Sequence, residues 1–177
     1  PTMAGEYNIA ILIQEWRQGV LIGSVVRDMQ ITISACNNRP PVIEASDTCV
    51  TAGTLIHMPI TATDPDGGEV TLTATGLCFQ IPSPAYFPGN SSISPVSSFF
   101  TWQTSCGHIS ASPYSVFFKA VDSGPQVALS NYKTIYITVV APKPDNLEAF
   151  AIGNSIHLSW DSYNCTNGIG FKIYRRN

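Results

Sequence analysis

The sequence predicts an all-β protein, and three observations carry this prediction. Apolar and polar residues alternate over many short runs, which is the pattern of a half-buried strand. No window of eleven or more residues carries the helical spacing i, i+3, i+4, i+7 without an interrupting Gly or Pro. Thirteen Gly and thirteen Pro separate the runs at the short spacing that is typical of β-sandwiches.

The individual strands follow from which residues share a face. In the segment 114–120, Tyr114, Val116, Phe118 and Ala120 fall on one face, and the residues between them fall on the other. The same alternation predicts strands over 7–13, 70–74 and 156–160. Clusters of Asp, Ser, Asn, Gly and Pro between the runs predict turns at 64–68, 122–125 and 164–168.

Composition and charge exclude several classes of protein. The 177 residues are 44% hydrophobic and only 12% charged, which is typical of a folded domain and not of a disordered chain. The net charge of −3 gives no basic excess for a nucleic-acid backbone. The apolar stretches are far shorter than the ~20 residues of a membrane helix. The chain begins with Pro1, so we expect a processed product or a piece of a longer protein.

An internal repeat predicts the domain organisation. The segment 7–15 aligns with 114–122 at an offset of 107 residues, and 31–33 aligns with 137–139 at an offset of 106. A period of this length is close to the ~100 residues of an immunoglobulin-like sandwich. We therefore expect residues 1–37 to be the last two strands of one truncated sandwich, and residues 38–141 to be a complete one.

The C-terminal segment differs from the rest. Pro142-Lys-Pro144 predicts a stiff, extended spacer. The residues that follow, with Leu147, an LSW run ending at Trp160 and GFKIYR over 170–175, resemble the opening strands of a fibronectin type III domain. The resemblance implies that 142–177 is a second truncated domain with Trp160 in its core.

The acidic turn Asp64-Pro-Asp66-Gly, the strand end at Asp122 and the linker Asn37-Asn38 resemble a cadherin-type repeat. In that family the matching turn, strand end and linker converge on Ca²⁺, so the resemblance implies a calcium site here. Calcium prefers six to eight oxygen ligands from carboxylates, amides and the backbone. The alternative is that Asp-Pro-Asp-Gly is only a favourable turn, because Asp tolerates the required backbone angles.

Five cysteines in a weakly charged β protein favour an oxidising, extracytoplasmic setting. Alternating strand directions place Cys49, Cys78 and Cys106 at the end of the complete domain that lies away from the acidic turn. We favour a Cys49–Cys106 disulfide, with Cys78–Cys106 as the competing pair, and we expect Cys165 to pair beyond Asn177. Free buried cysteines that act as small hydrophobic residues are the other interpretation.

Two regions are candidate binding loops. Trp16 and Arg17 lie in a turn-like segment where an aromatic ring would be exposed. The segment 82–98 is long and rich in Pro, Ser and Gly, and it carries Tyr86 and Phe87. Loops on rigid scaffolds often carry recognition, although a plain surface excursion is the more favoured interpretation of this segment.

Enzyme signatures are absent from the sequence. The three histidines share no spacing, and no Gly-x-Ser-x-Gly, Walker or dinucleotide motif occurs. Cys106-Gly-His108 is a weak candidate for a nucleophile–base pair, because such residues seldom adjoin in sequence and a disulfide-bonded cysteine is no nucleophile. The sequence therefore predicts a non-enzymatic protein.

The whole set of segments, from YNIAILIQEWRQG through ATDPDGGEVTLTATG to FKIYRR, resembles the repeat region of large gliding-motility-associated surface proteins that bacteria export by the type IX system. This resemblance implies an extracellular or cell-surface adhesive spacer. Its partners would be neighbouring domains of the same chain, the type IX machinery, and surface polysaccharide or other surface proteins. The alternative is an accessory carbohydrate-binding region of a secreted polysaccharide-degrading enzyme.

Overall fold

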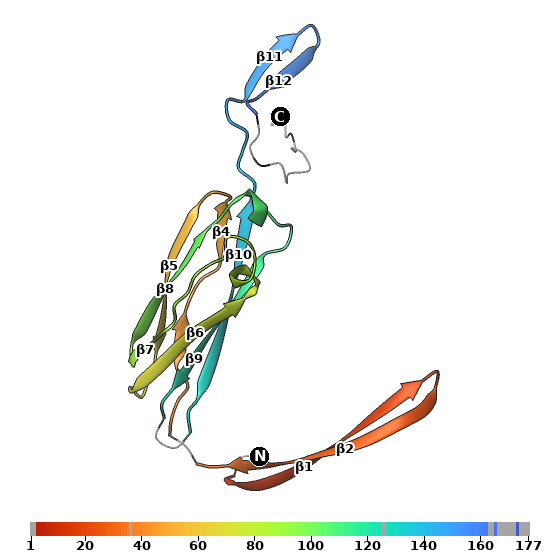
Figure 1. Ribbon diagram of the computed structural model, residues 1–177, viewed down its shortest axis with the longest axis vertical. Coiled ribbons are helices and arrows are strands. Elements are labelled where there is room, and N and C mark those ends of the chain that lie inside the picture. The colour runs from red at the N-terminus through yellow and green to blue at the C-terminus, as the bar shows by residue number, and fades with distance from the viewer. Residues whose placement is uncertain (1–2, 36, 125–126, 163–164, 166–172, 174–177) are drawn as a thin grey trace. The chain divides into compact units, whose positions relative to one another are not determined.

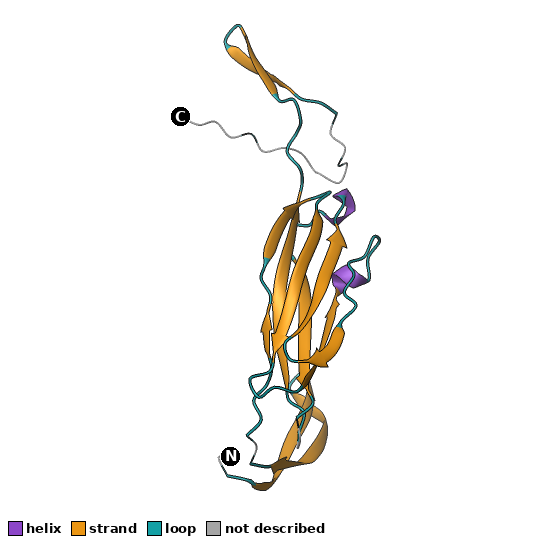
Figure 2. Ribbon diagram, turned by 90° about the vertical axis from the view of Figure 1, so that its left-hand side faces the viewer, coloured by secondary structure: helices purple, strands orange, loops and turns teal. Residues whose placement is uncertain are grey.

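A computed structural model describes residues 3–35, 37–124, 127–162, 165 and 173. The chain divides into two compact units, 1–37 and 38–177. In the described part, strands are joined by turns and two short 3-10 helices, η1 (Leu77–Phe79) and η2 (Cys106–His108) (Figure 2). The predicted all-β class is confirmed.

The first unit is a long antiparallel hairpin of β1 (Gly5–Arg17) and β2 (Val20–Ile33) (Figure 1). Its turn is only two residues long, and Gln18 and Gly19 both have positive φ angles, of 49° and 79°. Two residues of this kind form the turn whose twist matches that of a hairpin. The turn-like segment expected around Trp16 is therefore shorter than predicted, since β1 continues to Arg17.

The second unit contains a β-sandwich of two sheets (Figure 1). The larger sheet has the order β4-β10-β9-β6-β7, and the smaller sheet has the order β3-β5-β8. All paired strands are antiparallel except β4 and β10, which are parallel. The strands are β3 (Val42–Glu44), β4 (Thr48–Thr51), β5 (Leu55–Thr63), β6 (Glu69–Gly76), β7 (Asn90–Ile93), β8 (Val96–Gln103), β9 (Tyr114–Asp122) and β10 (Ser130–Val140).

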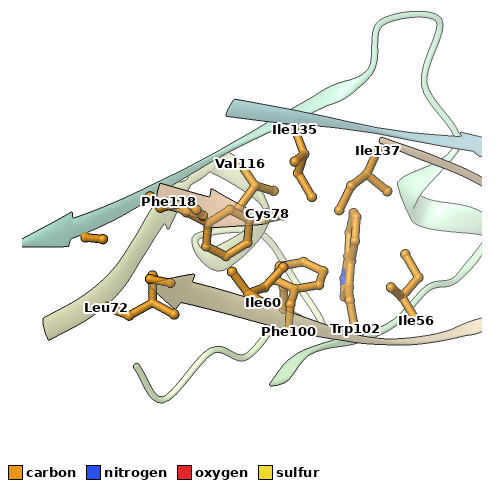
Figure 3. Packing of buried hydrophobic residues seen from close by; sticks show 14 of the residues in the cluster. Ile56, Ile60, Leu72, Cys78, Phe100, Trp102, Val116, Phe118, Ile135 and Ile137 are labelled. Carbon is orange, nitrogen blue, oxygen red and sulfur yellow. The ribbon is translucent and has the colours of Figure 1, made fainter. Parts of the chain in front are cut away.

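The core lies between the two sheets, and it is built from the faces that the alternating pattern predicted. Phe100 of β8 lies opposite Phe118 of β9, and Trp102 of β8 points toward Ile137 of β10 (Figure 3). The rings of Phe100 and Phe118 meet edge to face, with centroids 6.3 Å apart, which is a favourable aromatic geometry. Val116, Phe118 and Ala120 are fully buried, as expected for one face of this strand.

The segment 82–98 is more structured than the predicted loop. It forms β7, which pairs with β6, and the start of β8. Tyr86 also forms an isolated bridge with Thr101 of β8, with N–H···O bonds of 2.8 and 2.9 Å in the two directions. The Ser- and Pro-rich composition concealed this pairing, because the strands here are short and bounded by prolines.

After the sandwich, β11 (Glu148–Ile152) and β12 (Ser155–Ser159) form a second hairpin. Asn146 donates its side-chain amide to Asp161 over 2.7 Å and closes the base of this hairpin. Trp160 keeps 38% of its surface exposed in this structure, and its place in the core of a longer domain stays a prediction. The expected third strand around 170–175 lies outside the described residues, apart from Ile173.

Candidate functional site

The turn between β5 and β6 is organised by Asp64. One carboxylate oxygen of Asp64 accepts the backbone N–H of Asp66 at 2.9 Å. The backbone carbonyl of Asp64 accepts the N–H of Gly67 at 3.2 Å. Gly67 and Gly68 take the positive φ angles, 77° and 97°, that complete the turn. The N–H of Asp64 donates to Ser94 Oγ at 2.8 Å. The sequence-based interpretation of this motif as a strong turn therefore describes its local geometry.

Asp122 holds the loop between β9 and β10. Its Oδ1 accepts the backbone N–H groups of Gly124 and Leu129, at 3.1 and 2.7 Å. Its Oδ2 accepts the side-chain amide of Asn38 at 2.8 Å. Only 4% of Asp122 is exposed, and these three hydrogen bonds satisfy its buried carboxylate oxygens. Asp122 therefore ties the start of the sandwich domain to its last hairpin.

Arg39 is the residue that sequence reasoning missed. Its backbone N–H donates to Asp66 Oδ2 at 2.6 Å, and its Nε and Nη2 donate to Asp66 Oδ1 at 3.0 and 2.7 Å. Nη2 also donates to the carbonyl of Pro65 at 2.9 Å. No short-range pattern could have identified this pair, because 27 residues separate its members.

The ion pair changes the acid–base properties of both partners. The hydrogen bonds from Arg39 lower the pKa of Asp66 below its usual range. The bond to Asp66 in turn raises the pKa of Arg39, and the nearby charge of Asp64 adds to this in a smaller way. Both side chains therefore carry full charge over the ordinary pH range, although the guanidinium side chain is 62% exposed and solvent screens part of the attraction.

The predicted calcium ligands are partly brought together. Asp64, Asp66, Asp122 and Asn38 lie in turns at the ends of β5 and β9 and in the segment before β3. Asn37 belongs to the hairpin unit. Among the residues that the structure describes, no three His, Cys, Asp or Glu side chains are grouped so that they could hold a metal ion. The arrangement, with carboxylate oxygens already bonded to Arg39, Asn38 and backbone amides, does not fit a calcium site.

The cysteines pair differently from the prediction. Cys106, in η2, forms a disulfide with Cys165, at a sequence separation of 59 residues. Cys49 is exposed and free, and Cys78 is buried and free, so neither predicted pair forms. The prediction that Cys165 pairs beyond Asn177 is corrected by the same bond. The error has a physical cause, since strand direction fixes the end at which a cysteine lies but not the loop that approaches it.

The disulfide shows that Cys106 and His108 do not form a nucleophile–base pair. The sulfur of Cys106 is bonded to Cys165, and His108 is a buried structural residue. The ring of His108 bonds the backbone N–H of Ser105 at 3.0 Å through Nδ1 and the carbonyl of Pro82 at 2.8 Å through Nε2. Burial raises the pKa of the buried Cys78 thiol to about 11, which keeps this thiol neutral at ordinary pH.

The binding-loop candidates divide into exposed and packed residues. Trp16 is 58% exposed and Tyr86 is 66% exposed, and Arg17 is also at the surface. Phe87 packs against the core instead, with its ring edge to face with Phe118 at 5.2 Å. Phe87 is therefore a structural residue, and its neighbour Tyr86 points outward from the same segment.

The outer face of the smaller sheet carries a stacked pair of rings that the sequence did not indicate. His57 of β5 and Phe99 of β8 stack face to face, with centroids 4.4 Å apart and planes 8° apart. His57 Nδ1 lies 3.2 Å from the hydroxyl of Thr101, which pairs on its other side with Tyr86. We call His57, Tyr86 and Phe99 the outer aromatic group. Their proximity depends on strand register, which composition does not reveal.

No protein-family model and no curated protein matches the sequence. Solved structures give weak likenesses. A mutant of the SrpA adhesin from Streptococcus sanguinis has a TM-score of 0.41 and 18% identity over 63% of each chain. Domains 4 and 5 of the S-layer protein SbsC have a TM-score of 0.38 and 14% identity, over 67% of this chain and 63% of that one. Domains 1–6 of SbsC have a TM-score of 0.38 and 15% identity, over 93% of this chain and 22% of that one. This chain thus spans less than two thirds of the length of each of them.

Proposed function

We propose that this chain is a non-enzymatic spacer and adhesive segment of a large bacterial cell-surface protein, built from sandwich modules in series. One observation carries the proposal. The hairpin of the first unit repeats, pair by pair, the β9–β10 hairpin of the sandwich. A chain that repeats one structural unit is suited to extend a binding end away from a surface.

The equivalence extends to the strand register. In the first unit Tyr7 pairs with Ile31, and at offsets of 107 and 106 residues Tyr114 pairs with Ile137. Every second pair after these two also corresponds, for three further pairs along each hairpin. They are Ile9 with Met29, Ile11 with Arg27 and Ile13 with Val25 in the first unit, and Val116 with Ile135, Phe118 with Lys133 and Ala120 with Asn131 in the sandwich.

The two hairpins differ in what covers them. Val116 and Ile135 are fully buried by the opposite sheet, whereas Ile9 and Met29 remain 41% and 48% exposed. A two-stranded hairpin with an uncovered apolar face is marginally stable in water. We therefore infer that the equivalent face of the first unit is covered, in the longer protein, by a sheet of the β3-β5-β8 kind from a preceding module.

The finer parts of the proposal rest on the sequence resemblance. They are a role in gliding or adhesion, export by the type IX system, a fibronectin type III domain beginning after the Pro142–Pro144 spacer, and contact with surface polysaccharide or other surface proteins. The described residues contain no helix long and apolar enough to cross a membrane.

Hydrogen exchange tests the modular proposal. In the 177-residue chain, the amides of 9–13 should exchange quickly and those of 116–120 slowly. In a protein extended by about 100 residues at the N-terminus, both sets should be protected. Ile11→Asp should abolish the new protection, whereas Leu12→Asp, on the opposite face of the same strand, should preserve it. Fast exchange of 9–13 in the longer protein would exclude a preceding module.

The second candidate function is carbohydrate binding within a secreted polysaccharide-degrading enzyme, and the outer aromatic group favours it. Exposed aromatic rings beside hydroxyl groups can stack on a sugar ring and bond its edge. The test is retention on insoluble polysaccharide, with Tyr86→Ala and Phe99→Ala compared with Tyr132→Ala on the other sheet. Selective loss with the first two variants would support this function, and equal retention of all proteins would remove it.

A further inference from the structure

We propose that the guanidinium of Arg39 is the built-in cation of the acidic turn, so that the segment 38–41 is held onto the sandwich without calcium. The starting observation is a disagreement. The resemblance implies a divalent cation among Asp64, Asp66 and Asp122, whereas the structure places an arginine side chain against this turn.

The geometry of the contact is that of specific recognition. Arg39 makes three hydrogen bonds to Asp66 and a fourth to the carbonyl of Pro65. The two carboxylate oxygens are thus engaged by different atoms of one residue, the backbone on one side and the planar guanidinium on the other. A lysine could offer charge but not this fork of donors.

Other carboxylate oxygens near the turn are also engaged. Asp122 accepts three hydrogen bonds, from Asn38, Gly124 and Leu129. Asp64 uses one oxygen to accept the N–H of Asp66. Calcium needs six to eight oxygen ligands, and it would have to displace these donors to obtain them. The intrachain donors therefore occupy oxygens that a metal would need as ligands.

The two contacts act on adjacent residues of the leading segment. Asn38 bonds to Asp122 in the loop after β9, and Arg39 bonds to Asp66 in the turn after β5. A third bond, from the Asn131 side chain to the carbonyl of Pro41 at 2.9 Å, fixes the same segment to β10. Polar groups thereby bond the segment 38–41 to three separate parts of the sandwich, and Pro41 is also buried.

Thermal unfolding in the presence of a chelator or of millimolar calcium tests this proposal. The melting temperature of the unmodified chain should not change in either case, and calorimetric titration with CaCl₂ should give no binding heat. Arg39→Gln should lower the melting temperature by about 2–4 °C, and Arg39→Lys should recover only part of the loss.

Lys133→Gln is the matched control, because it removes one positive charge from an exposed side chain of the same sandwich. It should have little effect. The proposal is overturned if calcium raises the melting temperature of the unmodified chain, or if Arg39→Gln behaves like Lys133→Gln. Should Arg39→Gln not fold, Asp66→Asn replaces it, and the calcium titration of the unmodified chain remains decisive. None of these outcomes depends on whether a module precedes the hairpin.

Discussion

Asn38 donates its side-chain amide to Asp122 across 84 residues of sequence, over a distance of 2.8 Å. The same amide also reaches the carbonyl of Val127 at 3.2 Å. One side chain at the start of the sandwich domain therefore bonds both the end of β9 and the loop that leads to β10. Gly124, which has no Cβ, leaves room for the Asn38 side chain.

Gly124→Ala should destabilise the sandwich by about 1–3 kcal/mol. A Cβ at this position would collide with the Asn38 amide and lie 2.6 Å from the backbone oxygen of Val127, which cannot move aside easily. Urea unfolding measures the loss. Gly107→Ala is the control, since its Cβ would meet only Ser105 Oγ, at 3.6 Å. Equal stability of the two variants would contradict the packing described here.

Phe118→Ala should cost about 3–5 kcal/mol, because it opens a cavity between the two sheets. Its neighbour Phe117 is 47% exposed on the outer face of the same strand, so Phe117→Ala should change stability by only ~0.5 kcal/mol. Denaturant melts of the two variants test which face of β9 is inward. A larger loss at Phe117 would show that the register is shifted by one residue.

Removing the Cys106–Cys165 bond should lower stability by roughly 2–4 kcal/mol, because the bond closes a long loop in the unfolded chain. Cys106→Ser and Cys165→Ser should give the same loss, and each should make the protein insensitive to reductant. Cys49→Ser serves as the control and should unfold like the parent. Peptide mapping without reduction should recover one cross-linked pair, and a peptide joining Cys49 to Cys106 would refute the connectivity.

Alkaline pH should destabilise the sandwich through Cys78. Burial raises its pKa to about 11 in the folded state, so the unfolded chain loses this proton first. Stability contributed by the neutral thiol is complete below the ordinary thiol pKa and falls as pH rises toward the folded value. Thiol-labelling at neutral pH should modify Cys49 readily and Cys78 only on unfolding. Urea unfolding of the parent and of Cys78→Ala should be compared as pH rises. The variant has no thiol at position 78 to ionise, so the difference between the two separates this effect from general alkaline unfolding.

Acid should weaken the Arg39–Asp66 contact, whereas the effect of Cys78 appears at alkaline pH. The folded-state pKa of Asp66 is lowered, so its contribution is complete above the usual Asp pKa and is lost as pH falls through the lower, folded value. Urea midpoints between neutral pH and strong acid should therefore decline less for Asp66→Asn than for the parent. Glu44→Gln, which removes an exposed carboxylate elsewhere in the domain, should decline like the parent.

Much of the fold could be predicted because strands and turns depend on short-range sequence patterns. The alternation in 114–120 identified the inward face of β9, and Asp64-Pro-Asp66-Gly identified the turn after β5. The repeat at offsets of 107 and 106 residues even matched the register of two hairpins. Short strands such as β7 escaped prediction, because Ser and Pro on both sides hide a four-residue alternation.

The candidate site could be predicted only in part. Asp122 and Asn38 were identified as neighbours through a resemblance, whereas Arg39 was overlooked because a charged residue beside two prolines has no characteristic pattern. The stacking of His57 on Phe99 depends on the pairing of β5 with β8, which brings together residues 42 positions apart.

The sequence by itself determined the β class, the turn at 64–68 and the inward face of β9, because neighbours along the chain decide these through backbone preference and burial. The predicted turn at 164–168 lies outside the described residues apart from Cys165. Tertiary structure alone decided that Arg39 meets Asp66, that Cys106 bonds Cys165, and which aromatic rings remain outside. These outcomes depend on how loops from distant strands approach one another, and that approach is fixed only when the two sheets close over a common core.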